Sequence, residues 1–292
     1  MILRITDLVA RAIGTLPLGV GVRLANALGP VAYALARGQR RRAEANLRLA
    51  WPEQSDDWVR RMVVDAFRNR LLTAFELMRF ARHGAGGLPP IEWRGRDRLR
   101  AELGRDSGVM LLSGHLGNYW LIPISLSAQG DRTSMLATLA PPTGPFTVRG
   151  IFRTYLYRRL LPRAGVAIVD TSSGSREGMS ERLGAGDLLF VMADLPVGRV
   201  VEGRLLDAEH PLPVGPAEVA GSAGAVVSPV MTHRRPDGSH EISVEPELAL
   251  DGGPEHAMQS YLALLERHVR SAPAQWHWFH RHWQGAERAP SP

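Results

Sequence analysis

The spacing of apolar side chains along this chain follows two different periods. From Asp56 to about Arg82, apolar residues recur at helical spacing, and Ser55, Asp56 and Asp57 provide a cap and an acidic first turn. This segment is therefore predicted to be a long helix whose apolar face packs on the core.

Beyond residue 87, short apolar runs alternate with segments that can form helices. Strands are predicted at Val109–Leu112, Met135–Thr138, Val166–Val169, Leu188–Met192, Ala225–Met231 and Glu241–Val244. Helices are predicted near 94–103, 118–129, 147–161, 176–184, 215–223 and 255–271. This alternation predicts an α/β fold with a mainly parallel central sheet, helices on both faces and an N-terminal helical segment.

Two uncharged stretches near the N-terminus, Ala12–Val22 and Leu24–Ala36, are separated by Arg23. Each is shorter than the roughly 20 apolar residues that span a bilayer. We predict two short amphipathic helices, which either cover the core or lie on a membrane surface. The expected division is an N-terminal helical segment (1–84) that can contact a membrane, an α/β core (85–285) and a flexible tail (286–292).

Charge and composition narrow the choice of partner. The chain of 292 residues carries 35 basic residues against 29 acidic ones, a net charge of +6, and every basic residue is an arginine. The absence of cysteine excludes disulfides and a cysteine nucleophile, and the absence of lysine excludes a Schiff base. The positive charge favours a lipid headgroup, a membrane surface, coenzyme A or an acyl-carrier protein. No nucleic-acid motif is present, so nucleic acid is not an expected partner.

A histidine lies shortly after the first predicted strand. His115 stands in Ser113–Leu121, between Gly114 and Gly117, at a strand-to-helix turn where sheet proteins place their chemistry. A neutral imidazole there can take a proton from a hydroxyl or amine that attacks a thioester. Asn118 and the amides around Gly117 could bind the oxyanion or the acceptor. The alternatives are that His115 only caps or packs and that Asn118 only shapes the turn.

The stretch His115–Tyr119 after an apolar strand resembles the first motif of the lysophospholipid acyltransferase superfamily. The branch it resembles holds the bacterial lipid A lauroyl/myristoyl acyltransferases and the phosphatidylinositol mannoside acyltransferases. Four further segments agree in order: Asn46–Glu53, Asp187–Asp194, Leu212–Ala217 with Ala223–Ala225, and Pro273–His280. The resemblance therefore covers most of the chain.

This resemblance implies an enzyme of lipid biosynthesis with no cofactor other than its donor. It would move an acyl group from acyl-CoA or acyl-carrier protein to a hydroxyl or amine of a glycolipid or a natural-product intermediate. His115 would be the general base. The open alternatives are a catalytically silent protein that binds lipid or an acyl carrier, and a thioester hydrolase. The expected location is the cytoplasm, with peripheral contact to the inner face of the cell membrane left open.

One position departs from the family pattern of a histidine, four residues and then an acid, because Trp120 replaces the acid. Asp194 ends an apolar strand, so its carboxylate should lie at the same sheet edge as His115. We therefore hypothesise that Asp194 is the substitute partner, with Glu202 as the runner-up and a loop-capping carboxylate as the alternative. His115 could also work unaided on a better nucleophile.

Several arginines could extend the expected site. Arg149, Arg153, Arg158 and Arg159 fall in one predicted helix, and guanidinium groups suit phosphate. The family has an arginine in this region that supports the active site, and Arg158 is the best match. The expected substrate-binding residues are thus Asn118, Arg149, Arg158 and Glu202. The alternative is that most of the four arginines are only solvated.

No metal site is expected at His277, His280 and His282, because their spacing does not place all three on one helical face. The resemblance suggests that the aromatic residues between them pack against the sheet or line an acyl channel. The acyl length, the acceptor and the choice of donor stay open.

Overall fold

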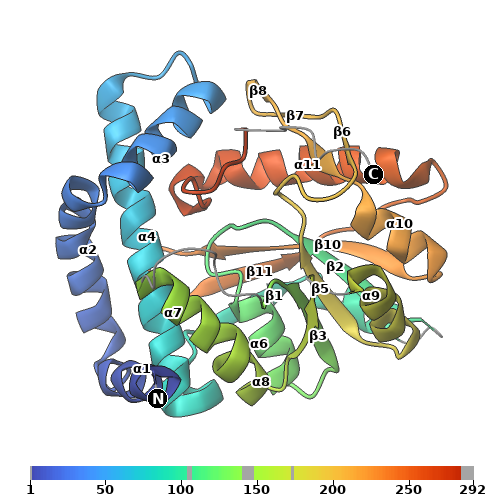
Figure 1. The fold of residues 1–292 in the computed structure, drawn as a ribbon, viewed down its shortest axis with the longest axis horizontal. Coiled ribbons are helices and arrows are strands. Elements are labelled where there is room, and N and C mark those ends of the chain that lie inside the picture. The colour runs from blue at the N-terminus through green and yellow to red at the C-terminus, as the bar shows by residue number, and fades with distance from the viewer. Residues whose placement is uncertain (1, 104–106, 140–147, 172–173, 284–292) are drawn as a thin grey trace.

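The computed structural model describes residues 2–103, 107–139, 148–171 and 174–283, with the backbone alone at 148 and 149 (Figure 1). The expected tail, 286–292, lies outside these residues.

The first part of the described chain is helical. It comprises α1 (Ile2–Ile13), α2 (Leu18–Leu35), α3 (Arg37–Ala50), α4 (Asp56–His83) and the short 3₁₀ turn η1 (Gly84–Gly87). The predicted long helix is α4, and the Ser55 hydroxyl accepts a hydrogen bond from the Trp58 amide over 3.3 Å, as an N-cap does. The arginine-rich stretch 37–50 forms a helix that was not predicted from the sequence.

The boundary predicted inside the N-terminal apolar region was wrong. The chain breaks at Gly14–Pro17 rather than at Arg23, which lies within α2. A proline before the first turn ends one helix and starts the next, whereas an arginine on a half-exposed helix face interrupts nothing.

By length and composition, α2 could cross a membrane. In this structure it instead packs along α4 (Figure 1). Gly21 lies against the Phe75 ring and Gly29 against the Arg68 side chain, with no room for a Cβ at either glycine. The helix therefore lies on the protein surface, held by close contact with α4.

A seven-stranded sheet forms the centre of the molecule. Its strand order is β1 (Ile91–Arg94), β11 (His240–Val244), β10 (Val226–Arg234), β2 (Val109–Ser113), β5 (Leu188–Met192), β3 (Thr133–Ala137) and β4 (Ala167–Asp170). All neighbouring pairs are parallel except β10–β11. The predicted strands are present, each shifted by a few residues at most, while β1 was not predicted.

Two small antiparallel ribbons stand apart from this sheet. They pair β6 (Val200–Val201) with β9 (Leu212–Pro213), and β7 (Arg204–Leu205) with β8 (Ala208–Glu209). Strands of two residues leave no periodicity in the sequence, which explains why they were not predicted.

Helices cover both faces of the sheet, as predicted. One face carries α5 (Arg96–Glu102), α6 (Leu121–Ala128), α7 (Val148–Tyr155), the π-helical turn η2 (Leu156–Leu160) and α8 (Leu161–Arg163). The other carries α9 (Ser175–Gly184), α10 (Gly215–Ser222), α11 (Gly253–Ser271) and the 3₁₀ turn η3 (Pro273–Gln275).

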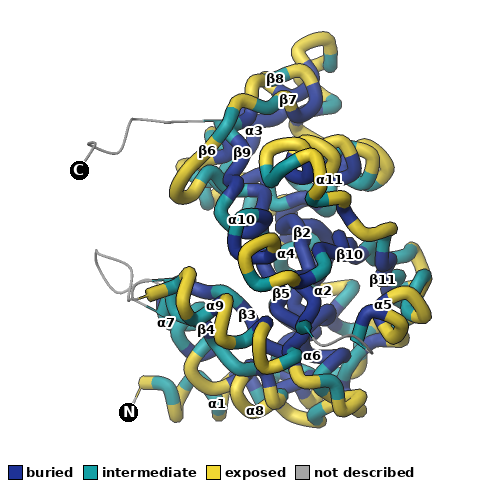
Figure 2. Tube along the Cα trace, turned by 90° about the vertical axis from the view of Figure 1, so that its right-hand side faces the viewer, coloured by how far each residue is buried: buried dark blue, intermediate teal, exposed yellow. Residues whose placement is uncertain are grey.

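The central strands are buried on both sides (Figure 2). In β2, Val109 and Leu111 belong to one apolar core, and Met110 and Leu112 belong to the other. Continuous apolar strands of this kind are typical of a parallel sheet between two helical layers. The chain is therefore an α/β protein with an N-terminal helical segment.

Candidate active site

The register of two neighbouring parallel strands brings His115 and Asp194 together. Ser113 of β2 pairs with Met192 of β5, and both strands end there. His115 and Asp194 each lie two residues beyond the end of their strand. Nδ1 of His115 is 2.6 Å from Oδ1 of Asp194. The contact thus follows from the meeting of strand ends at one edge of the sheet.

Asp194 is fully buried and its carboxylate is saturated with donors. Oδ2 accepts the backbone N–H of His115 over 2.8 Å and the indole N–H of Trp276 over 2.9 Å. Burial raises the pKa of this carboxyl, but the charge and the hydrogen bonds of His115 outweigh burial, so the pKa lies well below its ordinary value. Asp194 is therefore a carboxylate at any physiological pH.

The turn that carries His115 requires its glycines. A Cβ at Gly114 would lie 2.7 Å from a Leu265 methyl group and 3.3 Å from Oδ2 of Asp194. Gly117 has a φ of +59° and passes directly against the backbone carbonyl of Thr232. Both positions let the turn approach its neighbours closely, which sets the imidazole against Asp194.

The segment after α11 clamps the same turn from the other side. The Gly117 amide donates to the Gln275 carbonyl and the His277 amide donates to the His115 carbonyl, each over 2.9 Å. Trp276 thereby lies where its indole reaches Asp194. A C-terminal segment thus fixes both the histidine and its acid.

The imidazole of His115 is surrounded by polar aromatic rings. Its ring centroid lies 5.0 Å from that of Tyr119, 4.5 Å from His280 and 6.2 Å from His277. The side chain is 8% exposed, and Asp194 holds its Nδ1. His115 is therefore held in a polar site, rather than packed in hydrocarbon.

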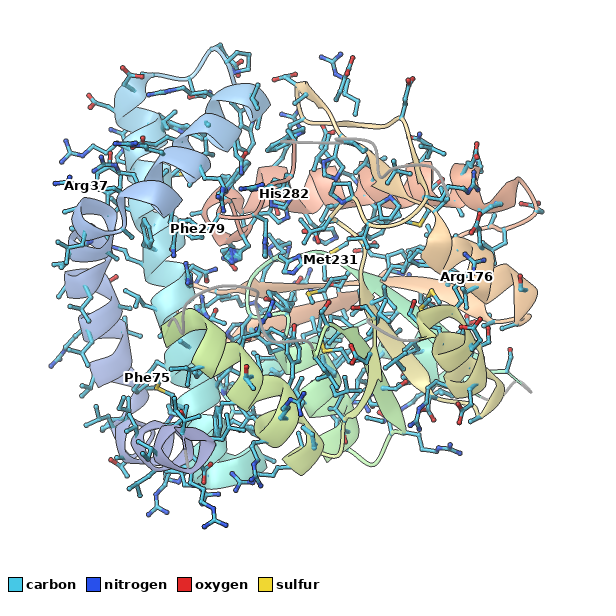
Figure 3. The ribbon with its side chains drawn as sticks, viewed as in Figure 1. Arg37, Phe75, Arg176, Met231, Phe279 and His282 are labelled. Atoms are coloured by element: carbon cyan, nitrogen blue, oxygen red, sulfur yellow. The ribbon has the colours of Figure 1, made fainter. Side chains whose placement is uncertain are left out.

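The C-terminal aromatic residues are core residues. Trp276, Trp278 and Phe279 are buried, and the His282 ring stacks on Trp276 with centroids 3.9 Å apart. His282 Nδ1 also lies 3.3 Å from the Asp194 carbonyl oxygen. Figure 3 labels His282 and Phe279, both of which belong to the segment that follows α11. Burial lowers the pKa of His282, and the negative charge of Asp194 offsets only part of this shift. A neutral His282 ring therefore packs beside Asp194. These residues therefore pack against the sheet, which is one of the two roles expected for them.

A second buried polar network, which was not predicted from the sequence, lies against the same turn. Glu76 of α4, which is 1% exposed, accepts hydrogen bonds from Asn118 Nδ2 and Arg234 Nη2, each over 2.8 Å. Its Oε1 also contacts Arg234 Nε at 3.1 Å and His240 Nε2 at 3.2 Å. Burial raises the pKa of Glu76, but the Arg234 charge and the His240 hydrogen bond bring it down to about 2. One ionised carboxylate therefore ties α4, β10, β11 and the histidine turn together.

The position that holds an acid in the resembled motif holds a buried tryptophan in this chain. Trp120 is 7% exposed, and its ring lies 4.6 Å from that of Tyr119 and 5.6 Å from that of Tyr157. It belongs to the apolar core beneath α6. An acid at this position would lose this aromatic packing.

The other expected site residues fall in different places. Asn118 is fully buried, and its Nδ2 donates to Glu76. Glu202 is exposed between β6 and β7, and it is Asp194 that contacts the imidazole. Arg158 is exposed on η2. Arg149 is the second residue of α7, and its side chain lies outside the described part of the chain.

Comparison with known proteins places the chain in a family. The family model described as bacterial lipid A biosynthesis acyltransferase matches residues 4–285, nearly the whole chain. A comparison with curated proteins finds no match.

Proposed function

Because the chain belongs to the bacterial lipid A biosynthesis acyltransferase family, we propose that it transfers an acyl group from a thioester to a hydroxyl or amine acceptor. The donor would be acyl-CoA or an acyl-carrier protein. The acceptor would be a glycolipid or a natural-product intermediate. The observation that carries the proposal is the 2.6 Å contact between His115 and the buried Asp194 at one edge of the sheet.

In this proposal Asp194 sets the tautomer of the imidazole. Its carboxylate accepts the Nδ1–H of His115, which leaves the lone pair of Nε2 free to take a proton. The fixed negative charge also stabilises the imidazolium that forms. Asp194 would therefore have the role that the acid at position 120 has in the resembled motif.

The reaction needs no covalent enzyme intermediate. The acceptor O–H or N–H gives its proton to Nε2 while its oxygen or nitrogen attacks the thioester carbonyl carbon. The tetrahedral adduct then collapses, the carbon–sulfur bond breaks, and the sulfur leaves with the proton from Nε2. The thioester is already activated, so positioning and proton transfer are the tasks left to the protein.

Replacement of His115 tests this proposal. His115→Ala should lower acyl transfer by about 10²–10⁴-fold, the usual contribution of a general base. His256→Ala, at an exposed histidine of α11, is the matched control and should keep full activity. Both proteins would be incubated with acyl-CoAs or acylated carrier protein and candidate acceptors, and products read by mass spectrometry. Unchanged turnover by His115→Ala would reject His115 as the base.

A second candidate function is a silent protein that binds lipid or an acyl carrier, and the tryptophan at position 120 favours it. The same assay separates the two. Binding of a thioester by the wild-type protein, without transfer to any acceptor or to water, would support the silent protein. Turnover with water as the sole acceptor would point to a hydrolase.

A further inference from the structure

The backbone amides of the turn that carries His115 are bonded within the protein. The three successive amides of residues 115–117 donate to the Asp194 carboxylate, the Gly114 carbonyl and the Gln275 carbonyl over 2.8, 2.8 and 2.9 Å. An amide with such a partner can stabilise the negative charge of a reacting carbonyl oxygen only after that hydrogen bond breaks. These amides hold the turn in shape, and they are not preorganised for an oxyanion.

The side chain of Asn118 is engaged in the same way. It is fully buried, and its Nδ2 donates to the ionised Glu76 over 2.8 Å. The reaction proposed above nevertheless builds negative charge on the thioester carbonyl oxygen when the acceptor attacks. Removal of one donor to such an oxygen costs about 10²–10³-fold in kcat. Polar side chains next to His115 are therefore the candidates for this donor.

Of the three polar rings around the imidazole of His115, that of His280 lies nearest. The two ring centroids are 4.5 Å apart, whereas the centroid distances from His115 to Tyr119 and His277 are 5.0 and 6.2 Å. An acceptor atom lies one hydrogen bond from Nε2 of His115, and the carbonyl under attack lies about 3–3.5 Å from that atom. A ring in contact with the imidazole can therefore reach the carbonyl oxygen.

The chemistry of an imidazole suits a donor at this place. A neutral imidazole carries one N–H in either tautomer and two when protonated, so His280 offers a donor in each of its protonation states. His280 is partly exposed, whereas His115 is only 7% exposed. A substrate that approaches from solvent can therefore contact His280 on its way to the base.

Helix α3 holds the backbone of His280 in place. Nδ2 of the fully buried Asn46 donates to the carbonyl oxygens of Trp278 and His280 over 2.7 and 2.8 Å. Arg42 donates to the carbonyl oxygen of Phe279, the residue before His280, over 3.3 Å. Phe279 is labelled in Figure 3. The ring of His280 is thus carried by a backbone that the protein itself fixes, as a preorganised donor requires.

We propose that His280 is a further catalytic residue, which donates an N–H to the carbonyl oxygen of the thioester while His115 takes the proton of the acceptor. As the acceptor attacks, the π electrons of the carbonyl move to this oxygen, and the hydrogen bond from His280 strengthens. When the carbon–sulfur bond breaks, these electrons return and the carbonyl forms again. His280 keeps its proton throughout. This proposal rests on the proposed function, to which it adds the group that polarises the donor.

Substitutions of His280 separate hydrogen bonding from packing. His280→Phe keeps a ring against His115 and removes the donor, so kcat should fall about 10²–10³-fold with little change in KM. His280→Asn and His280→Gln lose the ring but keep an N–H near one or the other of its nitrogens, so at least one should stay within about tenfold of wild type. A packing role predicts the reverse order, which would overturn the proposal. His256→Phe, at an exposed histidine of α11, is the control and should keep full activity.

A donor with sulfur in place of the carbonyl oxygen tests the contact itself. In a dithioester C=S replaces C=O, and sulfur accepts hydrogen bonds weakly. The loss of kcat in His280→Phe should therefore shrink from at least about a hundredfold with the thioester to less than about tenfold with the dithioester. An equal loss with both donors would show that His280 does not contact the carbonyl oxygen. A loss in His277→Phe without one in His280→Phe would assign the donor to His277 and reject His280.

Infrared spectroscopy of a bound donor reports on the same contact without turnover. The probe is dodecanoyl-CoA with ¹³C at its carbonyl carbon, bound in the absence of an acceptor. Its carbonyl stretch should lie at a lower frequency in the wild-type protein than in His280→Phe, because a hydrogen bond weakens the C=O bond. Equal frequencies in the two proteins would overturn the proposal. Thermal unfolding checks that each variant is folded, and His280→Leu replaces His280→Phe if the larger ring does not fit.

The two proposals can fail separately. If His115→Ala keeps full turnover, His115 is not the base, and the infrared frequencies still decide whether His280 binds the carbonyl oxygen. If His115→Ala loses transfer while His280→Phe keeps both the activity and the carbonyl frequency of the wild type, only the role of His280 is rejected. Loss of transfer in both variants, with the frequency raised in His280→Phe, supports both proposals.

Discussion

Trp276 donates its indole N–H to Oδ2 of Asp194 over 2.9 Å, on the oxygen that does not contact the His115 ring. The tryptophan thus holds one oxygen of the carboxylate while the other faces the imidazole. The orientation of Asp194 therefore depends on a residue near the C-terminal end of the described chain, 82 positions further along.

Loss of the indole donor should reduce turnover more than loss of a similar ring elsewhere. Trp276→Phe keeps most of the packing and removes a hydrogen bond to a charged group, with an expected cost of about 1.5–3 kcal/mol in stability. We expect kcat to fall about tenfold because the carboxylate can rotate. Trp278→Phe is the control, since Trp278 donates to the Pro273 carbonyl instead. Equal kcat in the two variants would show that the Trp276 donor has no part in catalysis.

Removal of the Asp194 charge should reduce turnover strongly. Asp194→Asn keeps the size of the side chain but favours the wrong imidazole tautomer, so kcat should fall by about 10²–10⁴-fold. Asp187→Asn serves as the control. Asp187 is also buried, but it precedes β5 at the opposite end and pairs with Arg132 over 3.1 Å. The kcat of both variants would be measured by steady-state kinetics. Full activity in Asp194→Asn would show that Asp194 has no role in catalysis.

An acid at position 120 should not improve the enzyme. Trp120→Asp would place a charge without a partner in the apolar core and leave a cavity, which should lower stability by more than about 3 kcal/mol. Thermal unfolding and kcat would be measured beside Trp120→Phe, which keeps an aromatic ring. A variant with Asp at 120 that folds well and turns over faster would mean that Asp194 does not replace the family acid.

The Glu76 network should give stability that depends on acid pH. The pKa of Glu76 is about 2 in the folded chain against an ordinary 4.5, so its ionised form favours folding. This contribution is fully present above about pH 4.5 and is lost as the pH falls toward 2. The difference in unfolding free energy between wild type and Glu76→Gln should be on the order of 3 kcal/mol at neutral pH.

Denaturant titrations from neutral pH down to the acid limit of folding measure this difference. It should shrink as the pH drops below about 4.5. Glu53→Gln, at an exposed position before α4, controls for the loss of one surface charge. A difference for Glu76→Gln that stays constant over this range would contradict the ionised network.

The ends of the central strands could be predicted from the sequence because buried parallel strands are continuous apolar runs. Leu188–Met192 was predicted with its observed bounds, and Val109–Leu112 lacked only Ser113. A residue shortly after each run must lie at the carboxyl edge of the sheet. That is how His115 and Asp194 could be expected near each other, whereas their pairing needed the strand order, which the sequence does not contain.

The Glu76 network was out of reach for a different reason. Its members come from α4, the histidine turn, β10 and β11, and no local pattern links residues so far apart. One signal was present, because Glu76 interrupts the apolar run Ala74–Met78 on the core side of a helix. A buried carboxylate needs a cationic or hydrogen-bonding partner, but the position of Glu76 does not say which of the chain's arginines supplies it.

The position of β5 in the sheet has a consequence for assembly. It lies between β2 and β3, both of which are made before it. A nascent chain in which β2 and β3 paired with each other would have to reopen to admit β5, and until then the imidazole would have no acid. Recovery of acyl transfer during refolding should therefore coincide with the insertion of this one strand.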